Sequence, residues 1–189
     1  MKGEKKSVHQ QYLLNDYKAP TPEAKERAED IRLNKEEMKI FMSYSELSGE
    51  LLVLGLGGCY VGQGEVITRS KKMYPSRNKK GLHQKAMLGS LAFCMEELED
   101  VLNNKVTLPD TISFYTNLKS NGINLATEID GDSEKRELVD KVQELKRTII
   151  QDFPQMHFEF RELDKDMRRY NPFFAAANNA ARRVIDKNK

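Results

Sequence analysis

The stretch KIFMSYSELSGELLVLGLGGCYVGQGEVITRSKKMY, residues 39–74, decides the fold of this chain. It holds three runs rich in strand-forming residues, over 39–45, 51–61 and 64–74, and they are separated by Ser-Gly and Gly-Gln-Gly turn signals. Because turns this short join neighbouring strands of opposite direction, the stretch predicts an antiparallel meander of three strands.

The rest of the chain alternates helical and strand patterns. The elements expected after the meander are, in chain order, a helix over 83–102, a buried strand over 111–116, a helix over 133–152, a strand around 156–160 and a helix over 172–186. The charged residues 161–169 are expected to form a loop. Three antiparallel strands followed by alternating helices and strands predict an α/β fold with a five-stranded mixed sheet flanked by helices.

The N-terminal part of the chain differs in composition from this pattern. Residues 1–20 show no period, and Thr21-Pro22-Glu23 then opens a polar helix that is expected to run to about Lys35. We therefore expect an N-terminal arm and polar helix over residues 1–37, and one α/β domain over residues 38–189.

The order of elements resembles the ribonuclease H-like superfamily over residues 38–186. Residues 40–45, IFMSYS, resemble the first strand of that family, and residues 112–117, ISFYTN, resemble its fourth strand. Asn171 resembles the asparagine that opens the final helix. The resemblance implies the fold given above.

The resemblance also implies where the catalytic carboxylates of family enzymes would fall. The four positions fall on Ser43, Lys85, Asn117 and Ala175, with Gln84 as a second possible register for Lys85. Family enzymes hold two divalent metals with clustered carboxylates, and neutral or cationic side chains are poor replacements for these ligands. We therefore expect a degenerate member without catalytic residues, a metal site or enzymatic activity.

Other acidic residues offer an alternative. Glu46 follows the first strand, and Glu162, Asp164 and Asp166 follow the fifth. These acids predict either a solvated rim or a displaced metal site, and the second case would make the chain a metal-dependent nuclease.

Basic residues are unevenly spread, although the net charge is only +2. The candidates for contact with nucleic acid are Lys71, Lys72, Arg77, Lys79, Lys80 and Lys85. A second basic group consists of Arg168, Arg169, Arg182 and Arg183. Each group is also what an ordinary solvated face would carry. RNA, DNA or a hybrid is thus a possible partner, but the near-neutral net charge favours a protein partner slightly.

Several remaining motifs point to structure rather than chemistry. The glycines at 55–58 and 62–64 lie between strands, so they predict close packing and turns instead of a phosphate loop. Cys59 and Cys94 are far apart and predict reduced core residues, and the isolated His83 predicts a capping or surface role.

No pattern in the sequence indicates a cofactor, a small-molecule substrate, a secretory signal or a membrane span. We therefore expect a cytoplasmic binding or scaffolding module for a macromolecular partner. The N-terminal arm and helix are its expected docking elements in the protein-assembly version of this hypothesis.

Overall fold

The computed structural model describes residues 20–49, 51–76, 80–116 and 132–186 of the 189-residue chain. Its strands are β1 (Glu37–Ser48), β2 (Leu52–Gly62), β3 (Glu65–Met73), β4 (Thr111–Thr116) and β5 (His157–Glu162). Its helices are α2 (Pro22–Leu33), α3 (Leu82–Glu96), α4 (Leu98–Asn103), α6 (Ser133–Asp152), α7 (Lys165–Arg168) and α8 (Pro172–Asp186).

The strands form one five-stranded sheet in the order β3-β2-β1-β4-β5. β1, β2 and β3 are antiparallel to one another, and Ser43 of β1 lies opposite Gly57 of β2. β4 runs parallel to β1, with Phe41 opposite Tyr115, and β5 runs parallel to β4. The predicted mixed sheet that begins with three antiparallel strands is confirmed.

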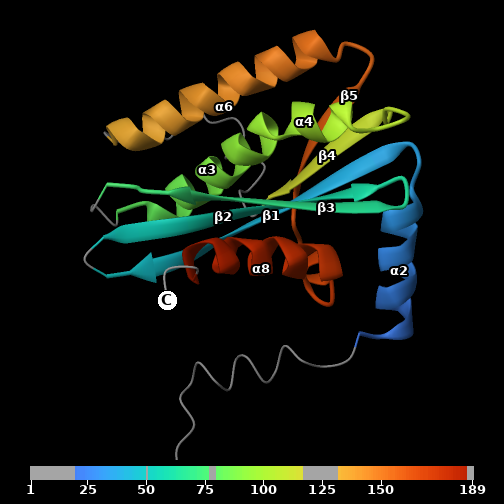
Figure 1. The fold of residues 1–189 in the computed structure, drawn as a ribbon, viewed down its shortest axis with the longest axis horizontal. Coiled ribbons are helices and arrows are strands. Elements are labelled where there is room, and N and C mark those ends of the chain that lie inside the picture. The colour runs from blue at the N-terminus through green and yellow to red at the C-terminus, as the bar shows by residue number, and fades with distance from the viewer. Residues whose placement is uncertain (1–19, 50, 77–79, 117–131, 187–189) are drawn as a thin grey trace, which may run out of the picture.

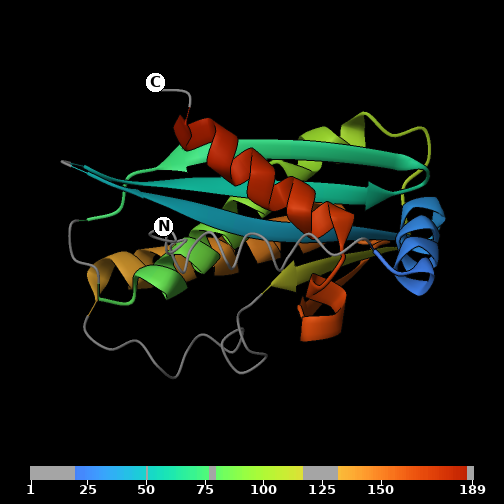
Figure 2. The same ribbon diagram turned by 90° about the horizontal axis from the view of Figure 1, so that it is seen from below.

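Helices cover both faces of this sheet (Figure 1, Figure 2). α3 and α4 lie on one face, and α6 lies beyond them, where it packs chiefly against α3. α8 crosses the opposite face over β1, β2 and β3. A hydrophobic core lies on each face of the sheet, and β1 contributes side chains to both because successive residues point to opposite faces. Ile40 and Met42 face α3, and Phe41 faces α8.

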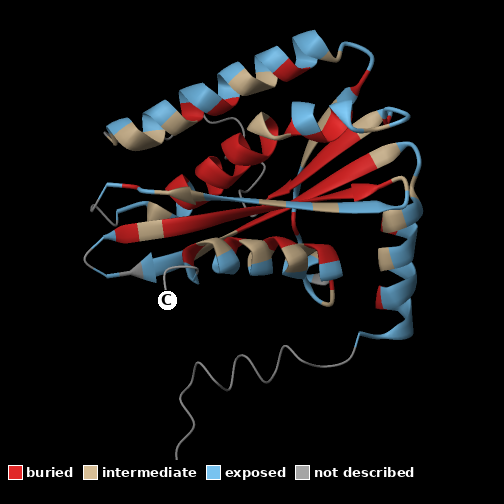
Figure 3. Cartoon of the chain, viewed as in Figure 1, coloured by how far each residue is buried: buried red, intermediate tan, exposed pale blue. Residues whose placement is uncertain are grey.

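β2 is buried along nearly its whole length, as Figure 3 shows. Two of its glycines allow α8 to lie directly on the strand. A Cβ atom at Gly55 would lie 1.9 Å from the carbonyl oxygen of Ala181, and one at Gly57 would lie 2.1 Å from that of Ala177. The expectation that these glycines serve close packing between the sheet and a helix is confirmed. In the turn after β2, Gln63 and Gly64 have φ values of 56° and 84°, as tight hairpin turns require.

The helix starts agree with the sequence signals. Thr21 accepts a hydrogen bond from Ala24 N at 3.3 Å and caps α2. Asn171 Oδ1 accepts bonds from the amides of Phe173 and Phe174 at 2.9 and 3.1 Å and caps α8. These contacts satisfy backbone N–H groups that have no partner within a helix.

Two expectations about elements are wrong. The helix expected over 83–102 is divided at Glu97, whose ψ of −9° departs from helical geometry and separates α3 from α4. The loop expected over 161–169 contains α7, because Asp164 Oδ1 accepts a bond from Met167 N at 2.6 Å and caps one helical turn.

α2 is attached to the body of the domain. Its buried residue Ile31 joins the core on the α8 face, which includes Phe41. Just after the helix, Asn34 O accepts a bond from Gln63 N at 2.7 Å, and Arg32 O accepts one from Gly64 N at 2.7 Å. β1 begins at Glu37, one residue before the boundary set at 38.

Within the described ranges, no helix combines the length and the apolar character needed to cross a membrane.

Candidate functional site

Ser43 lies in the middle of β1, and its side chain faces α8. The hydroxyl is 3.5 Å from Asn178 Oδ1 of α8, and the residue is 8% exposed. Its strand neighbour Gly57 is one of the two glycines on which α8 rests. The close approach of α8 to β2 therefore also sets Asn178 against Ser43.

The opposite helix reaches the same residue through its backbone. Ser90 of α3 is fully buried, and its hydroxyl lies 3.4 Å from the carbonyl oxygen of Ser43. The same hydroxyl donates to the carbonyl oxygen of Ala86 at 2.8 Å. Ser43 is thus held between two helices by an amide and a hydroxyl, and neither group carries a formal charge.

The next residue of β1 contacts the start of α3. The hydroxyl of Tyr44 lies 3.0 Å from Nδ1 of His83, and the two rings are 5.8 Å apart. Burial, together with the nearby Glu46, raises the pKa of Tyr44, so its phenol stays neutral at physiological pH. His83 itself is exposed, as expected for a surface role.

Lys85 makes the most deeply buried ion pairs among the described residues. Its side chain is 1% exposed, and its Nζ lies 2.9 Å from Asp132 Oδ2 and 2.8 Å from Glu134 Oε2. Glu134 also accepts bonds from the backbone N and the hydroxyl of Ser76, at 2.9 and 2.6 Å. This cluster, which we call the Lys85 cluster (Ser76, Lys85, Asp132 and Glu134), ties the loop before α3 and the start of α3 to the start of α6.

The charges of the Lys85 cluster stabilise one another. Burial alone would raise the pKa of Glu134, but the bonds from Lys85 and Ser76 outweigh it and lower that pKa. The bond from Lys85 lowers the pKa of Asp132. Burial alone would lower the pKa of Lys85, yet the two carboxylates raise it. The ammonium therefore stays charged and engaged, so in this arrangement it is not presented for the expected contact with a phosphate.

The four positions singled out from the resemblance are placed differently. Ser43 contacts α8 through Asn178, whereas Ala175 is exposed three residues earlier on that helix. Lys85 directs its charge toward α6. Asn117 lies outside the described residues. The sequence argument missed Asn178; an asparagine pair in the alanine-rich run AAANNAA, residues 175–181, was the signal available for it.

The acids considered for a displaced site lie at the surface. Glu46 and Glu162 are exposed, Asp164 caps α7, and the side chain of Asp166 is not among those described. Across the described ranges, no group of three or more His, Cys, Asp or Glu side chains is arranged to hold a metal ion.

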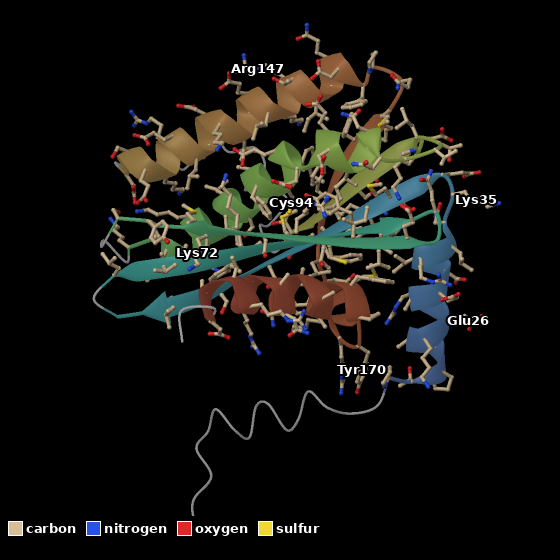
Figure 4. The ribbon with its side chains drawn as sticks, in the orientation of Figure 1. Glu26, Lys35, Lys72, Cys94, Arg147 and Tyr170 are labelled. Carbon is tan, nitrogen blue, oxygen red and sulfur yellow. The ribbon has the colours of Figure 1, made fainter. Side chains whose placement is uncertain are left out.

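The basic candidates separate in space. Lys71 and Lys72 point to opposite faces of β3, and Lys71 is paired with Glu96 of α3 at 3.2 Å. Lys72, labelled in Figure 4, is the neighbour of Gly55 in the sheet, on the side that α8 covers. Lys80 is exposed, and Arg77 and Lys79 lie outside the described residues.

The second basic group is also divided. Arg168 lies over the ring of Phe174 at 5.3 Å, near the start of α8. Arg182 and Arg183 are exposed near its C-terminal end, roughly 13 Å from Phe174 along the helix at 1.5 Å per residue. The four arginines therefore do not form one patch.

A polar network crosses the sheet on the α8 face. Ser113 Oγ donates to Glu37 Oε1 at 2.6 Å, Arg161 Nε donates to Glu159 Oε2 at 2.6 Å, and Arg161 also reaches the hydroxyl of Tyr115 at 3.2 Å. Each of these side chains has a partner within the network, so the network joins β1, β4 and β5 without needing a ligand.

Known structures share this architecture. The mixed five-stranded sheet with helices on both faces is the ribonuclease H-like fold. A similar solved structure is LC11-RNase H1 in complex with an RNA/DNA hybrid, at 12% identity and a TM-score of 0.51, covering 78% of this chain and 99% of that one.

Two further structures are less similar. The PFV RNase H domain matches at 10% identity and a TM-score of 0.44, over 79% of this chain and 94% of that chain. NurA bound to dAMP and manganese matches at 12% identity and a TM-score of 0.36, over 81% and 37% of the two chains. No protein-family model matches the sequence, and neither does any curated protein. The likeness to LC11-RNase H1, at 12% identity, shows the fold alone.

Proposed function

We propose that this chain is a non-catalytic ribonuclease H-like module that binds a macromolecular partner, foremost a protein. The observation that carries the proposal is the surroundings of Ser43. At the strand position where family enzymes are expected to have their first aspartate, the hydroxyl of Ser43 lies beside Asn178 Oδ1, and the backbone carbonyl oxygen of Ser43 lies beside the Ser90 hydroxyl.

The chemistry of these groups supports the absence of two-metal hydrolysis. Magnesium ions require anionic oxygen ligands, and two-metal sites use several of them. The oxygens at Ser43, Asn178 and Ser90 are neutral. Asp132 and Glu134, at the start of α6, already hold Lys85.

The state of the basic residues supports a protein partner over nucleic acid. A nucleic-acid site presents cations that can replace the counterions of phosphates. Lys71 is paired with Glu96 and Lys85 with two carboxylates, so two of the expected cations are already neutralised. α2 offers an exposed polar surface for docking, on which Glu26 is labelled in Figure 4.

A nuclease assay tests the non-catalytic part of the proposal. We expect no cleavage of a labelled RNA–DNA hybrid when Mg²⁺ or Mn²⁺ is titrated, with an active ribonuclease H run in parallel. Cleavage that depends on metal and is abolished by Glu46→Gln or Asp164→Asn would overturn it and establish a displaced site. Glu137→Gln, an exposed acid on α6, is the matched control.

The nucleic-acid version is the second candidate, because Lys72 and Lys80 lie on the domain and a protein of similar fold is described in complex with an RNA/DNA hybrid. Binding through phosphates would weaken steeply as salt rises. Titration of hybrid and duplex at low and moderate salt measures this. We expect no salt-dependent binding at low ionic strength; its presence would favour the nucleic-acid version.

Docking through the N-terminal region is tested by comparing the full chain with a protein that begins at Glu37. Partner recovery in a pull-down is expected to fall when residues 1–36 are removed. Unchanged recovery would move the docking surface to the α/β body.

A further inference from the structure

An apolar surface lies where the meander extends beyond α8. Leu47 of β1 lies opposite Val53 of β2. Tyr74 directly follows Met73, the last residue of β3, which pairs with Leu54. Leu51 precedes β2 at the same end of the sheet. We call these four residues the hairpin-end surface.

Period-two alternation places the two strand residues of this surface, Leu47 and Val53, on the α8 side of the sheet. Leu47 lies an even number of residues after Phe41, and Val53 lies two residues before Gly55; both of these reference positions face α8. Met73 packs toward Gly89 of α3, so the residue after it turns to the other face.

α8 stops short of covering these side chains. Ala181 and Val184 of α8 approach Gly55 of β2, and the helix ends at Asp186. Leu47, Leu51 and Tyr74 are left 44%, 61% and 64% exposed. Exposed apolar patches that are rimmed by polar residues mark interaction sites.

The rim is basic. Arg182 and Arg183 are exposed next to the two α8 residues that touch Gly55, and neither has an ion-pair partner within the described part of the chain. Lys72 lies opposite Gly55 on β3 and points to the same face (Figure 4). The described acids nearby are Asp186 at the helix end and Glu46, which precedes Leu47 and by alternation points to the other face of the sheet.

We propose that the hairpin-end surface binds a segment of a partner protein that combines apolar side chains with acidic ones. The aliphatic residues would bury apolar side chains of the partner, and Arg182 and Arg183 would face its carboxylates. This inference rests on the proposed function, since it assigns a surface and a chemistry to the protein partner.

Two other occupants fit less well. Single-stranded nucleic acid binds by stacking bases on aromatic rings, and Tyr74 is the sole aromatic side chain among the four residues of this surface. A second copy docked face to face would bring the arginine pairs of both copies together, and this repulsion disfavours self-association. Both occupants are outcomes of the test below.

The probe is a labelled amphipathic helical peptide made of leucine and glutamate, titrated by fluorescence anisotropy against the full chain. Its controls are a leucine–lysine peptide, an alanine–glutamate peptide and oligothymidylate. We expect the leucine–glutamate peptide to bind at least about tenfold more tightly than each control, because it alone matches both the apolar surface and the basic rim. Tighter binding of the leucine–lysine peptide or of oligothymidylate overturns the proposal, as does dimerisation of the free chain in analytical ultracentrifugation.

Variants assign the binding to this surface. We expect the double variants L51S/Y74S and R182E/R183E each to lower the affinity for the leucine–glutamate peptide about tenfold. Their far-UV circular dichroism should be unchanged. V106S/L108S is the matched control and should leave binding unchanged, since these apolar side chains are also exposed but belong to the loop beside the β2–β3 turn, at the other end of the meander. If both surface variants bind the peptide as tightly as the wild type does, this inference is overturned while the proposed function stands. Cleavage of a hybrid would instead remove the proposed function.

Discussion

At the residue scale, single side chains decide whether α8 can lie on the sheet. Gly55 and Gly57 place the backbone of α8 against β2, and Ala177 and Ala181 present the small side chains that this contact requires. The same contact brings Asn178 to Ser43. The candidate site thus depends on two glycines that have no polar role of their own.

We expect Gly57→Ala to lower the free energy of unfolding by about 3 kcal/mol, because the new methyl group would overlap backbone of α8 and overpacked contacts cost this much. Urea denaturation followed by circular dichroism measures the change. Gly49→Ala is the matched control, since the nearest atom to a Cβ there is 3.9 Å away, and it should be close to neutral. Equal stability of the two variants would contradict the close contact.

Residue-scale inference from sequence worked where the chemistry is local. The cap at Asn171 is set within three residues, and burial, which raises the pKa of the Cys94 thiol to about 12, agrees with an inert core cysteine. The sequence did not predict the partners of Lys85, because Asp132 and Glu134 lie far along the chain and meet Lys85 only through the packing of α6 on α3.

At the element scale, the Lys85 cluster fixes the start of α6 to the start of α3. Asp132 also caps α6 by accepting a bond from Lys135 N at 3.3 Å. One carboxylate therefore serves both the helix end and the ion pair. Removing Glu134 tests the tie without disturbing that cap.

We expect Glu134→Gln to lower the free energy of unfolding at pH 7 by about 1.5–3 kcal/mol, the usual value of hydrogen bonds to a charged group. The pKa of Glu134 is lower in the folded protein than in the unfolded chain. The contribution of its charge to the free energy of unfolding is therefore complete above the ordinary glutamate pKa, and it is lost as the pH falls through the folded pKa. The difference in free energy of unfolding between wild type and Glu134→Gln, measured by urea denaturation, should therefore be largest above about pH 5 and should shrink below about pH 4.

Glu137→Gln on the exposed side of α6 is the control for that series and should follow the wild type at each pH. If the difference in free energy of unfolding between wild type and Glu134→Gln stays constant down to acid pH, the charge of Glu134 does not contribute to stability.

α2 is the second element whose attachment can be measured. Ile31 is 7% exposed in the core on the α8 face, while Leu33 on the same helix is 51% exposed. We expect Ile31→Ala to cost about 2–3 kcal/mol and Leu33→Ala less than about 0.5 kcal/mol, by thermal or urea unfolding. Similar costs for both would show that α2 does not pack on the domain.

At the scale of the whole molecule, the layers differ in how they are held. β1 is paired on both sides and covered by helices on both faces, whereas α6 is an outer layer that rests chiefly on α3 (Figure 1). Segments with fewer buried contacts open at lower free energy than the global unfolding.

Native-state hydrogen exchange in low denaturant should therefore show α6 amides opening at lower free energy than those of β1. Glu134→Gln should speed exchange in α6 beyond its effect on global stability. If α6 and β1 exchange with the same opening free energy in both proteins, α6 belongs to one cooperative unit with the sheet.

The sequence by itself determined the order of the strands and of the longer helices, the mixed sheet, the caps and the role of the glycines, because these follow from hydrophobic period and turn chemistry within short windows. Tertiary structure decided the partners of the polar residues. Asn178 faces Ser43 across a helix–sheet contact, Lys85 is enclosed by α6, and Lys71 and Lys72 part to opposite faces. Which charged side chains meet depends on how segments far apart in the sequence pack against one another, and a local sequence pattern carries no information about that packing.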